Sequence, residues 1–486
     1  MIAESLKKAL LQAAIQGKLT EQLPEDGDAR DLLREIQKEK ARLIKEGKIK
    51  KQKPLPEITE DEIPFDIPEN WVWARLGNVT NYGVGRQVKP VDIPQNSWVL
   101  ELEDIDKNAF HVNSKKVDRI AGSNKNYFPK DDVLYGKLRP YLKKVLVAEQ
   151  EGYCSTEIIP FNGYGLIHSK YLMYYLVSPS TDGYINNITH GMDMPRLGTD
   201  KARQLLLPIP PISEQKRIVK KIEELLPEIE ALKAEENKLD NLEKAFPNKI
   251  RASILQAAIQ GKLTEQLPED GDARDLLKEI QKEKARLIRE GKIKKEKPLP
   301  EITENEIPFD IPDNWVWVRL GDIIFNRGQK KPSEKFTYID ISSIDNIKNT
   351  LGDLSNTLNP NEAPSRARKI VREGDVIYAT VRPYLHNICL IDRNIEPEPI
   401  VSTGFAVVTS TTQVINRFLF RCFLSPMFDD YANSNDNSKG VAYPAINDQK
   451  FNRALIPLPP LSEQKRIVEN LEDLLPLCTS LEETIL

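Results

Sequence analysis

The sequence lacks the features that mark membrane proteins, disulfide-bonded proteins and most enzymes. Its 486 residues contain no apolar run of 18 or more, so we expect no membrane span. The four cysteines show no CxxC spacing and the four histidines stand singly, which predicts a reducing, cytoplasmic location and no metal site. A GxxxxGKS/T loop and an HExxH motif are also missing, and this argues against nucleotide hydrolysis and zinc-protease chemistry.

The net charge of the chain is small, but the charged residues are unevenly distributed along it. The formal net charge is −4. Residues 71–210 carry 17 basic and 14 acidic side chains, a balance of +3, and residues 315–459 carry 17 and 15, a balance of +2. The rest of the chain therefore holds −9. This distribution is expected if the basic regions face phosphates and the acidic segments face protein.

What the sequence has in quantity is internal repetition. Residues 12–77 match residues 256–321 at a constant offset of 244, with 60 of 66 positions identical. The segment Pro-Ile-Pro-Pro-Ile-Ser-Glu-Gln-Lys-Arg-Ile-Val at 208–219 returns at 457–468 with only its Ile/Leu positions changed. Each end of the chain thus repeats one half of its middle. This predicts two domains on two scaffolds, related by a two-fold pseudo-axis within one polypeptide.

Two short helices and an extended arm are predicted in each long repeat. Apolar residues at helical spacing predict a helix over 3–17 and a second helix that is capped by Asp28 or Asp31 and ends at Gly47. The four prolines between 48 and 68 cannot extend a helix, so we expect an extended arm there. The sequence assigns no role to segments 27–60 and 271–304, which contain the second helix and most of the arm.

A longer helix is predicted to begin at each copy of the Ser-Glu-Gln-Lys-Arg motif. Apolar residues at heptad spacing predict helices over 213–245 and 462–486 that pair antiparallel as a coiled coil. Pro227 and Pro476 lie inside the two patterns and are expected to kink them. The predicted seam consists of Ile218, Ile222, Leu225, Ile229, Leu232, Leu239, Ile467, Leu471, Leu474 and Leu481.

Between the helical segments lie two regions of mixed α/β character. The first has strand-like runs at 98–102, 133–135, 145–147 and 158–161, and a helix is predicted over 168–177. The second, 315–459, repeats this plan with far less identity than the scaffold copies. The positions that the two regions share include Asp132 and Asp375, Arg-Pro-Tyr-Leu at 139–142 and 382–385, Ser-Thr at 155–156 and 402–403, and Pro195 and Pro444.

Together, the doubled proline and Ser-Glu-Gln-Lys-Arg motif, the Ile-Pro-x-Asn-Trp-x-Trp-x-Arg-Leu-Gly segment and the paired Arg-Pro-Tyr segments resemble the specificity subunit of Type I restriction-modification systems. The resemblance covers essentially the whole chain. It implies an α+β fold in which two target recognition domains each read one half of a split DNA site. The repeated helices would separate these domains and dock two methyltransferase subunits and, through them, restriction subunits.

This resemblance also implies where chemistry and cofactors lie. The chain has no Asn-Pro-Pro-aromatic motif of amino-methyltransferases, so we expect a non-catalytic subunit. S-adenosylmethionine would be on the methyltransferase, and ATP and Mg on the restriction subunit. The predicted domains are an N-terminal scaffold at 1–61, recognition domains at 62–210 and 306–459, a central scaffold at 211–305 and a C-terminal helix at 460–486.

Candidate DNA-binding residues fall into two groups. Arg139 and Arg382 occur in both domains, which must read different bases, so a framework role or a phosphate contact is favoured over base reading. Base-reading candidates lie where the domains differ: Arg86, Gln87, Lys89, Lys115, Lys116, Arg119 and Lys125 in the first, and Arg327, Gln329, Lys330, Lys331, Arg366, Arg368 and Lys369 in the second. Each could equally be a solvated surface charge. Trp71, Trp73, Trp315 and Trp317 are expected to anchor the core and not to stack on bases.

A second function fits the same pattern. The chain could be an adaptor without enzymatic activity, in which a duplicated coiled coil presents two diverged protein-binding domains. The divergent basic segments favour DNA, whereas the acidic total charge fits the adaptor.

Overall fold

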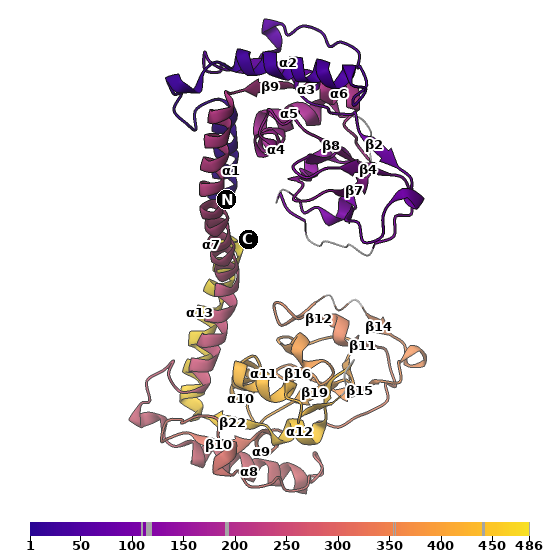
Figure 1. Ribbon diagram of the computed structural model, residues 1–486. Coiled ribbons are helices and arrows are strands. Elements are labelled where there is room, and N and C mark those ends of the chain that lie inside the picture. Colours follow the sequence, from indigo (N-terminus) through magenta and orange to yellow (C-terminus); the bar gives the residue numbers. More distant parts are fainter. Residues whose placement is uncertain are drawn as a thin grey trace. The chain divides into compact units, whose positions relative to one another are not determined.

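The computed structural model describes residues 1–107, 110–112, 119–189, 194–352, 354, 356–439 and 443–485. They form two compact units, Met1–Leu239 and Asp240–Leu486. Each unit holds scaffold helices and one mixed α/β domain (Figure 1). Among the described residues, no helix combines the length and apolar character that crossing a membrane requires.

In the first unit, α1 (Ile2–Ile15) packs antiparallel against the start of α7 (Ile212–Ile259). An ion pair of 2.9 Å between Lys7 Nζ and Glu230 joins the two helices. Their facing apolar side chains are buried, which is the main source of stability for such a pair. The buried residues are Leu10, Leu11, Ala14, Ile15, Ile218 and Ile222.

The second unit repeats this pairing with the other end of α7. Here α13 (Leu461–Ile485) lies against the part of α7 that follows residue 240. Arg251 Nη2 donates to Thr479 Oγ1 at 3.0 Å, at the place equivalent to the ion pair of Lys7. The buried apolar residues here are Leu255, Ala258, Ile259, Ile467 and Leu471.

Antiparallel helix packing is present, but the partners differ from those predicted. We expected 213–245 and 462–486 to pair with each other, whereas Ile218 and Ile222 pack against α1, and Ile467 and Leu471 pack against the later part of α7. We expected the first long helix to end at residue 245, whereas α7 has 48 residues and also contains the second copy of the α1 sequence. Pro247 lacks one backbone N–H donor, yet helical residues on both sides and packing against α13 continue the helix.

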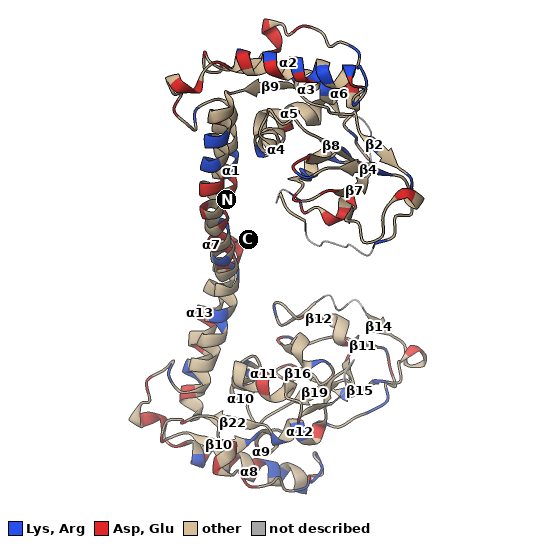
Figure 2. Ribbon diagram, in the orientation of Figure 1, with Lys and Arg blue, Asp and Glu red and all other residues tan. Residues whose placement is uncertain are grey.

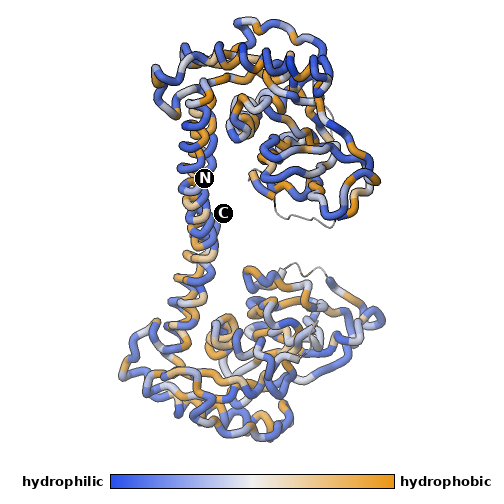
Figure 3. Tube along the Cα trace, viewed as in Figure 1, coloured by the Kyte–Doolittle hydropathy of each residue, from blue (hydrophilic) through white to orange (hydrophobic). Residues whose placement is uncertain are grey.

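The predicted seam residues differ in burial along the helices. Ile218, Ile222, Ile467 and Leu471 are buried, and Leu225, Ile229, Leu474 and Leu481 are half-buried. In contrast, Leu232 is 37% exposed and Leu239 is 56% exposed. Figure 3 shows hydrophobic and hydrophilic residues interspersed along these helices. The apolar stripe thus extends beyond the surface that α1 covers.

The first α/β domain contains two small sheets and is closed by the antiparallel pairing of β1 (Val72–Arg75) with β9 (Leu206–Ile209). One sheet has the order β2 (Arg86–Val88), β4 (Lys125–Phe128), β7 (Gly152–Ser155), β3 (Val99–Leu100). The other has the order β6 (Val145–Val147), β5 (Val133–Gly136), β8 (Ile158–Phe161). Its helices are α3 (Leu76–Val79), α4 (Ser169–Val177), α5 (Pro179–Ile188) and α6 (Thr199–Arg203). The strands predicted in the second sheet and the helix predicted over 168–177 are confirmed.

The second α/β domain has the same plan. It is closed by β10 (Val316–Arg319) with β22 (Leu455–Leu458). Its sheets have the orders β14 (Thr357–Leu358), β11 (Phe336–Ile339), β18 (Pro399–Ser402), β15 (Ala367–Ile370), and β17 (Ile388–Leu390), β16 (Val376–Ala379), β19 (Phe405–Val408). Two-stranded pairs join β12 (Ile344–Asp345) to β13 (Thr350–Leu351) and β20 (Ser438–Lys439) to β21 (Ala445–Ile446). Its helices are α9 (Leu320–Ile323), α10 (Gln413–Phe423), α11 (Pro426–Asn433) and α12 (Asp448–Arg453).

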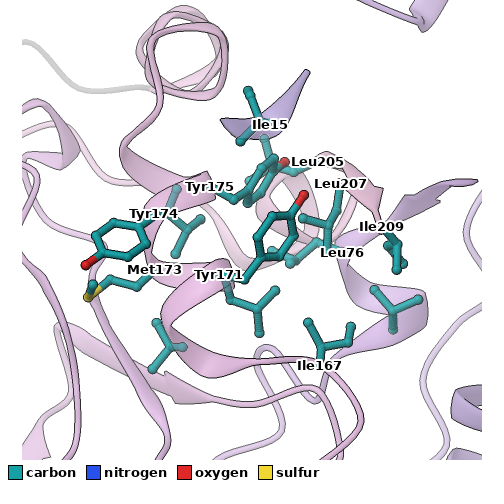
Figure 4. Packing of buried hydrophobic residues seen from close by; sticks show 14 of the residues in the cluster. Ile15, Leu76, Ile167, Tyr171, Met173, Tyr174, Tyr175, Leu205, Leu207 and Ile209 are labelled. Atoms are coloured by element: carbon teal, nitrogen blue, oxygen red, sulfur yellow. The ribbon is translucent and has the colours of Figure 1, made fainter. Parts of the chain in front are cut away.

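Tyrosines of α4 connect the first domain to its scaffold (Figure 4). Tyr171 and Tyr175 are buried among Ile15 of α1 and the apolar side chains around β9. Their hydroxyls donate to the carbonyls of Pro208 and Leu206 at 2.7 and 2.8 Å. The buried rings therefore contribute apolar area without leaving a polar group unsatisfied.

The Ser-Glu-Gln-Lys-Arg motif joins the long helix to the scaffold loop beside it. The buried Glu214 carboxylate accepts from Trp71 Nε1 and Gln22 Nε2, both at 2.8 Å. Asp26 accepts from Ser213 Oγ at 2.7 Å and from Arg217 Nη1 at 2.6 Å. A buried charge of this kind needs several donors.

The same joint recurs in the second unit. Glu463 accepts from Trp315 Nε1 at 2.8 Å, and Asp270 accepts from Arg466 Nη1 at 2.7 Å. Trp71 and Trp315 are buried, as expected of core anchors. This joint accounts for the identity of the two motif copies.

The segments without an assigned role form a brace on each α/β domain. The helices α2 (Ala29–Lys45) and α8 (Ala273–Arg289) carry intermixed basic and acidic residues on their outer faces (Figure 2). Lys40 Nζ donates to the Gly77 carbonyl at 2.6 Å, and Lys284 Nζ donates to the equivalent Gly321 carbonyl at 2.6 Å. Burial lowers the pKa of Lys40 to about 8. Each lysine thus caps carbonyls of the short helix that opens the α/β domain.

Candidate nucleic-acid interface

The segments that both α/β domains share in sequence meet at one edge of each domain. In the first unit, Lys137 N–H donates to the Glu157 carbonyl at 2.9 Å, and Leu197 N–H donates to the Lys137 carbonyl at 2.9 Å. Arg139 N–H donates to the Pro195 carbonyl at 2.7 Å. We call residues 137–143, 155–157 and 194–197 the shared edge of the first unit.

The second unit reproduces this arrangement bond for bond. Thr380 N–H donates to the Gly404 carbonyl and Ile446 N–H donates to the Thr380 carbonyl, both at 2.9 Å. Arg382 N–H donates to the Pro444 carbonyl at 2.7 Å. Its shared edge comprises residues 380–386, 402–404 and 443–446.

A turn with two left-handed residues lies at the centre of each shared edge. Arg139 and Lys143 have φ values of 51° and 50°, and Arg382 and His386 have 51° and 49°. Residues with a side chain rarely adopt this conformation, which costs roughly 1–2 kcal/mol at each position. Both domains keep it at the same places, which is typical of a functional constraint.

Each turn is braced by an ion pair to a neighbouring helix. Lys143 Nζ lies 2.9 Å from Asp182 of α5, and His386 Nε2 lies 2.6 Å from Asp429 of α11. The hydrogen bond to Asp429 raises the pKa of His386, whereas burial alone would lower it. The same brace is thus built with a permanent cation in one domain and a titratable one in the other.

The arginine of each turn has a backbone role in both domains and a different side-chain setting in each. The Arg139 side chain is exposed, whereas the half-buried Arg382 guanidinium lies 4.3 Å from the ring centroid of Tyr443. Met194 stands at the place of Tyr443 in the first unit. The backbone N–H of each arginine thus holds the shared edge together, and the framework role favoured for the arginine side chains stays a prediction.

Of the variable candidates in the first unit, those on the edge strand β2 are exposed. Arg86, Gln87 and Lys89 face solvent, and the Arg86 guanidinium lies 6.0 Å from the Tyr127 ring centroid. They lie on or directly after an outer strand of the four-stranded sheet. Lys115 and Lys116 lie outside the described residues.

The other two candidates of the first unit hold its fold together. Arg119 forms a two-pronged ion pair with Asp104, at 2.6 and 3.0 Å, which raises the pKa of the arginine. Lys125 is 4% exposed and its Nζ lies 2.7 Å from Glu101. A DNA phosphate would have to displace these carboxylates, so we leave both residues out of the proposed contact surface.

The candidate residues of the second unit also fall into paired residues and exposed ones. Arg327 donates to the buried Asp375 at 2.7 and 3.0 Å, and the buried Lys369 Nζ donates to the Phe405 carbonyl at 2.6 Å. Lys330 forms an ion pair with Glu398, and Arg368 donates to the carbonyl of Ala367 at 2.7 Å. Gln329, Lys331 and Arg366 are exposed.

The structure adds residues that sequence reasoning missed. Tyr141 and Tyr384 follow the proline of each turn and are 51% and 50% exposed. Met194 and Tyr443, next to the turns, are 48% and 67% exposed. The signal in the sequence was a tyrosine retained in both diverged domains, which is easily mistaken for a core residue.

The described residues contain no group of three or more His, Cys, Asp and Glu side chains placed to hold a metal ion. The shared edges and the exposed basic residues on and after β2 are the candidates for contact with a ligand. They contain no arrangement of nucleophile and base that would suggest a reaction at the site.

Comparisons with known proteins give the family to which this chain is similar. The family model of the Type I restriction modification DNA specificity domain matches residues 68–241 and 312–486. The chain is 30% identical over 542 residues to the Type I restriction enzyme EcoAI specificity subunit of Escherichia coli, covering 99% of this chain and 90% of that protein. The EcoEI specificity subunit of the same species is 26% identical over 541 residues, with the same coverage.

A solved structure, the HsdS subunit from Thermoanaerobacter tengcongensis, aligns with a TM-score of 0.44 at 19% identity, covering 87% of this chain and 93% of that one. The family model accounts for both α/β domains and for the long helices that follow them, and the EcoAI relative spans nearly the whole chain. The family is non-catalytic and selects the DNA target. This chain therefore belongs to the family of DNA specificity subunits of Type I restriction-modification systems, with two target recognition domains.

Proposed function

We propose that each α/β domain reads one half of a bipartite DNA target, and that the scaffold sets the spacing of the halves and docks the partner subunits. The main support is the contrast between the two scaffold copies and the two α/β domains. Near-identical scaffolds hold two domains with the same backbone framework and different exposed side chains. Base-reading candidates are Arg86, Gln87 and Lys89 in the first domain, and Gln329, Lys331 and Arg366 in the second.

The domain boundaries that fit this proposal are 62–210 and 306–459 for the recognition domains, with scaffold at 1–61, 211–305 and 460–486. Support comes from the pairing of β1 with β9 and of β10 with β22, which brings the two ends of each domain together. Segments 27–60 and 271–304 act in this scheme as braces, through Lys40 and Lys284.

The partners that we propose are two methyltransferase subunits and, through them, restriction subunits. S-adenosylmethionine would be bound by the methyltransferase, and ATP and Mg by the restriction subunit. Exposed apolar side chains on α7 support a protein-docking role, because a cluster of large apolar side chains on the surface of a soluble protein commonly marks a binding site. These are Leu232, Leu239, Leu242 and Phe246, which are 37%, 56%, 58% and 49% exposed.

Two scaffold copies predict a stoichiometry of two methyltransferase subunits per chain. Native mass measurement of the assembled complex should give this two-to-one ratio. The double variant Leu239→Asp with Leu242→Asp should lower the occupancy, because it places charge on an apolar surface. A complex with one methyltransferase subunit per chain would contradict the repeat-based docking.

A mobility-shift measurement on the assembled complex tests the DNA function itself. Binding to random duplex should weaken steeply with salt, and methylation profiling should yield one bipartite motif. Absent or salt-insensitive binding would instead support an adaptor with two protein-binding domains.

A further inference from the structure

The tyrosines of the two left-handed turns are common to both domains, and the proposed function gives them no role. Tyr141 and Tyr384 occupy the same position in domains that otherwise diverge, and about half of each side chain faces solvent. A side chain that discriminates bases must differ between domains with different targets. What these tyrosines contact must therefore be common to both half-sites.

The turns hold the tyrosines outward in a fixed conformation. Each tyrosine lies between two left-handed residues and directly after a buried proline, Pro140 or Pro383. The ion pairs to α5 and α11 hold the far end of each turn. An exposed side chain on so constrained a backbone loses little conformational entropy when it meets a ligand.

The charge around the turns favours a polyanion as the ligand. The shared edge of the first unit contains four Lys or Arg residues and one Glu, and that of the second contains one Arg, one His and no Asp or Glu. The single glutamate, Glu157, is paired with Arg196 at 3.2 Å, and Asp182 and Asp429 next to the edges pair with Lys143 and His386. With these carboxylates counted, basic side chains still outnumber acidic ones at each edge. The feature of DNA that is both negative and independent of sequence is the sugar–phosphate backbone, to which tyrosine hydroxyls commonly donate.

We propose that the Arg-Pro-Tyr turn is the sequence-independent anchor of each recognition domain, and that Tyr141 and Tyr384 contact the DNA backbone beside their half-sites. This inference rests on the proposed function. The anchor fixes the register of the domain on the duplex, and the variable residues of the neighbouring strands then meet the base edges.

The test uses the full chain assembled with its methyltransferase subunits. Equilibrium binding is measured for Tyr141→Ala, Tyr384→Ala and Tyr141→Phe on three duplexes: the cognate one, one with the first half-site scrambled, and a random one. Each alanine variant should weaken binding to cognate and random duplex alike, by roughly three- to tenfold, as for one lost hydrogen bond with its packing. The phenylalanine variant lacks only the hydroxyl, so its binding should be weakened by less than that of the alanine variant.

Selectivity and salt dependence give two further readouts. The ratio of cognate to scrambled affinity should stay unchanged, because no base contact is lost. The slope of affinity against salt should also stay unchanged, because a neutral tyrosine releases no counterion. Tyr184→Ala is the matched control: this tyrosine of α5 is 49% exposed in the same unit and outside the shared edge, so its loss should leave DNA binding unaltered.

The possible outcomes separate the anchor from its alternatives. A wild-type complex that fails to bind DNA overturns the proposed function itself. If the wild type binds and the alanine variants match it, the anchor is wrong. A change of selectivity at one half-site would make the tyrosine a base reader, and loss of methyltransferase subunits from the variant complex, seen by native mass measurement, would make the turn a protein contact.

Discussion

The residues Asp132 and Asp375 occupy equivalent buried positions but have different hydrogen-bond partners. Asp375 accepts from Arg327 and from Thr409 Oγ1, the latter at 2.8 Å. Asp132 accepts from the amide of Asn162 at 2.6 Å, and burial raises its pKa to about 6. One domain therefore holds a paired carboxylate where the other holds a carboxylate whose charge is unfavourable.

This difference predicts opposite effects of the same substitution. Above about pH 6 the buried Asp132 is charged at a cost, and below its unfolded pKa near 3.8 that cost disappears. Asp132→Asn should therefore stabilise the first unit at pH 7.5, on the order of 1–3 kcal/mol, and have little effect at pH 4. Thermal unfolding of the full chain at both pH values measures this.

The matched control is Asp375→Asn, which leaves the Arg327 guanidinium without its carboxylate. It should destabilise the second unit at pH 7.5 by about 3 kcal/mol, as expected when one partner of a largely buried ion pair is removed. Destabilisation by both substitutions at neutral pH would show that Asp132 is held by contacts as favourable as those of Asp375.

The residue types indicated a DNA-binding surface, but they did not show which basic residues are exposed on it. The argument that an arginine common to both domains cannot read different bases favoured a framework role or a phosphate contact for Arg139 and Arg382, and this role of their side chains stays a prediction. Sequence could not show that Arg119 and Lys125 are paired, because Asp104 and Glu101 approach them only when the domain folds. Long-range ion pairs of this kind leave no periodic signal.

At the scale of elements, the joint at the start of each long helix should be sensitive to acid. The Arg217 side chain, through its hydrogen bonds, lowers the pKa of Asp26 to about 2. The stability that the ionised Asp26 contributes to the folded state is therefore fully present above the unfolded pKa of 3.8 and is lost as the pH falls toward 2. Asp26→Asn should loosen this joint at neutral pH by about 1–3 kcal/mol.

Hydrogen exchange can follow each joint separately. Peptides from 212–222 and 461–471 differ in sequence, so each reports on its own unit. Asp26→Asn should speed exchange in the first peptide only, and Asp270→Asn in the second only. Faster exchange in both peptides from either substitution would mean that the two joints are coupled.

Helices and strands were predictable where local periodicity and packing agree. The β5, β6 and β8 strands and α4 appear where apolar runs predicted them. The end of α7 did not follow from local sequence, because we predicted a helix over 213–245 and Pro247 lies just beyond that predicted end. Helical neighbours and the contacts of α13 outweigh one missing N–H donor, and those contacts involve residues more than 200 positions away.

At the scale of the whole molecule, the continuous α7 allows a test of whether the scaffold sets the gap between the two DNA half-sites. α1 contacts α7 up to Glu236, and Arg251 already contacts α13. Seven residues inserted after Leu239 keep the heptad register and lie between these contacts. The helix should lengthen by about 10.5 Å, so the preferred gap between half-sites should grow by up to roughly three base pairs.

Genome methylation profiling of a strain carrying this variant measures the gap. The control is the same seven residues inserted after the exposed Lys51 in the extended arm, which should leave the gap as it was. Unchanged spacing in an assembled α7 variant would show that the helix does not set the distance.

The near-identity of the two scaffolds also has a genetic consequence. A crossover between the DNA encoding residues 12–77 and that encoding residues 256–321 would delete 244 codons in frame. The shortened protein would keep α1, the second recognition domain and α13. In it, the tryptophan beside Glu463 would be Trp71 or Trp315 according to the crossover point, and Lys7 would stand where Arg251 meets Thr479. A single recombination event could thus turn a gene for two different half-sites into a gene for one complete unit, whose self-association would specify a symmetric target.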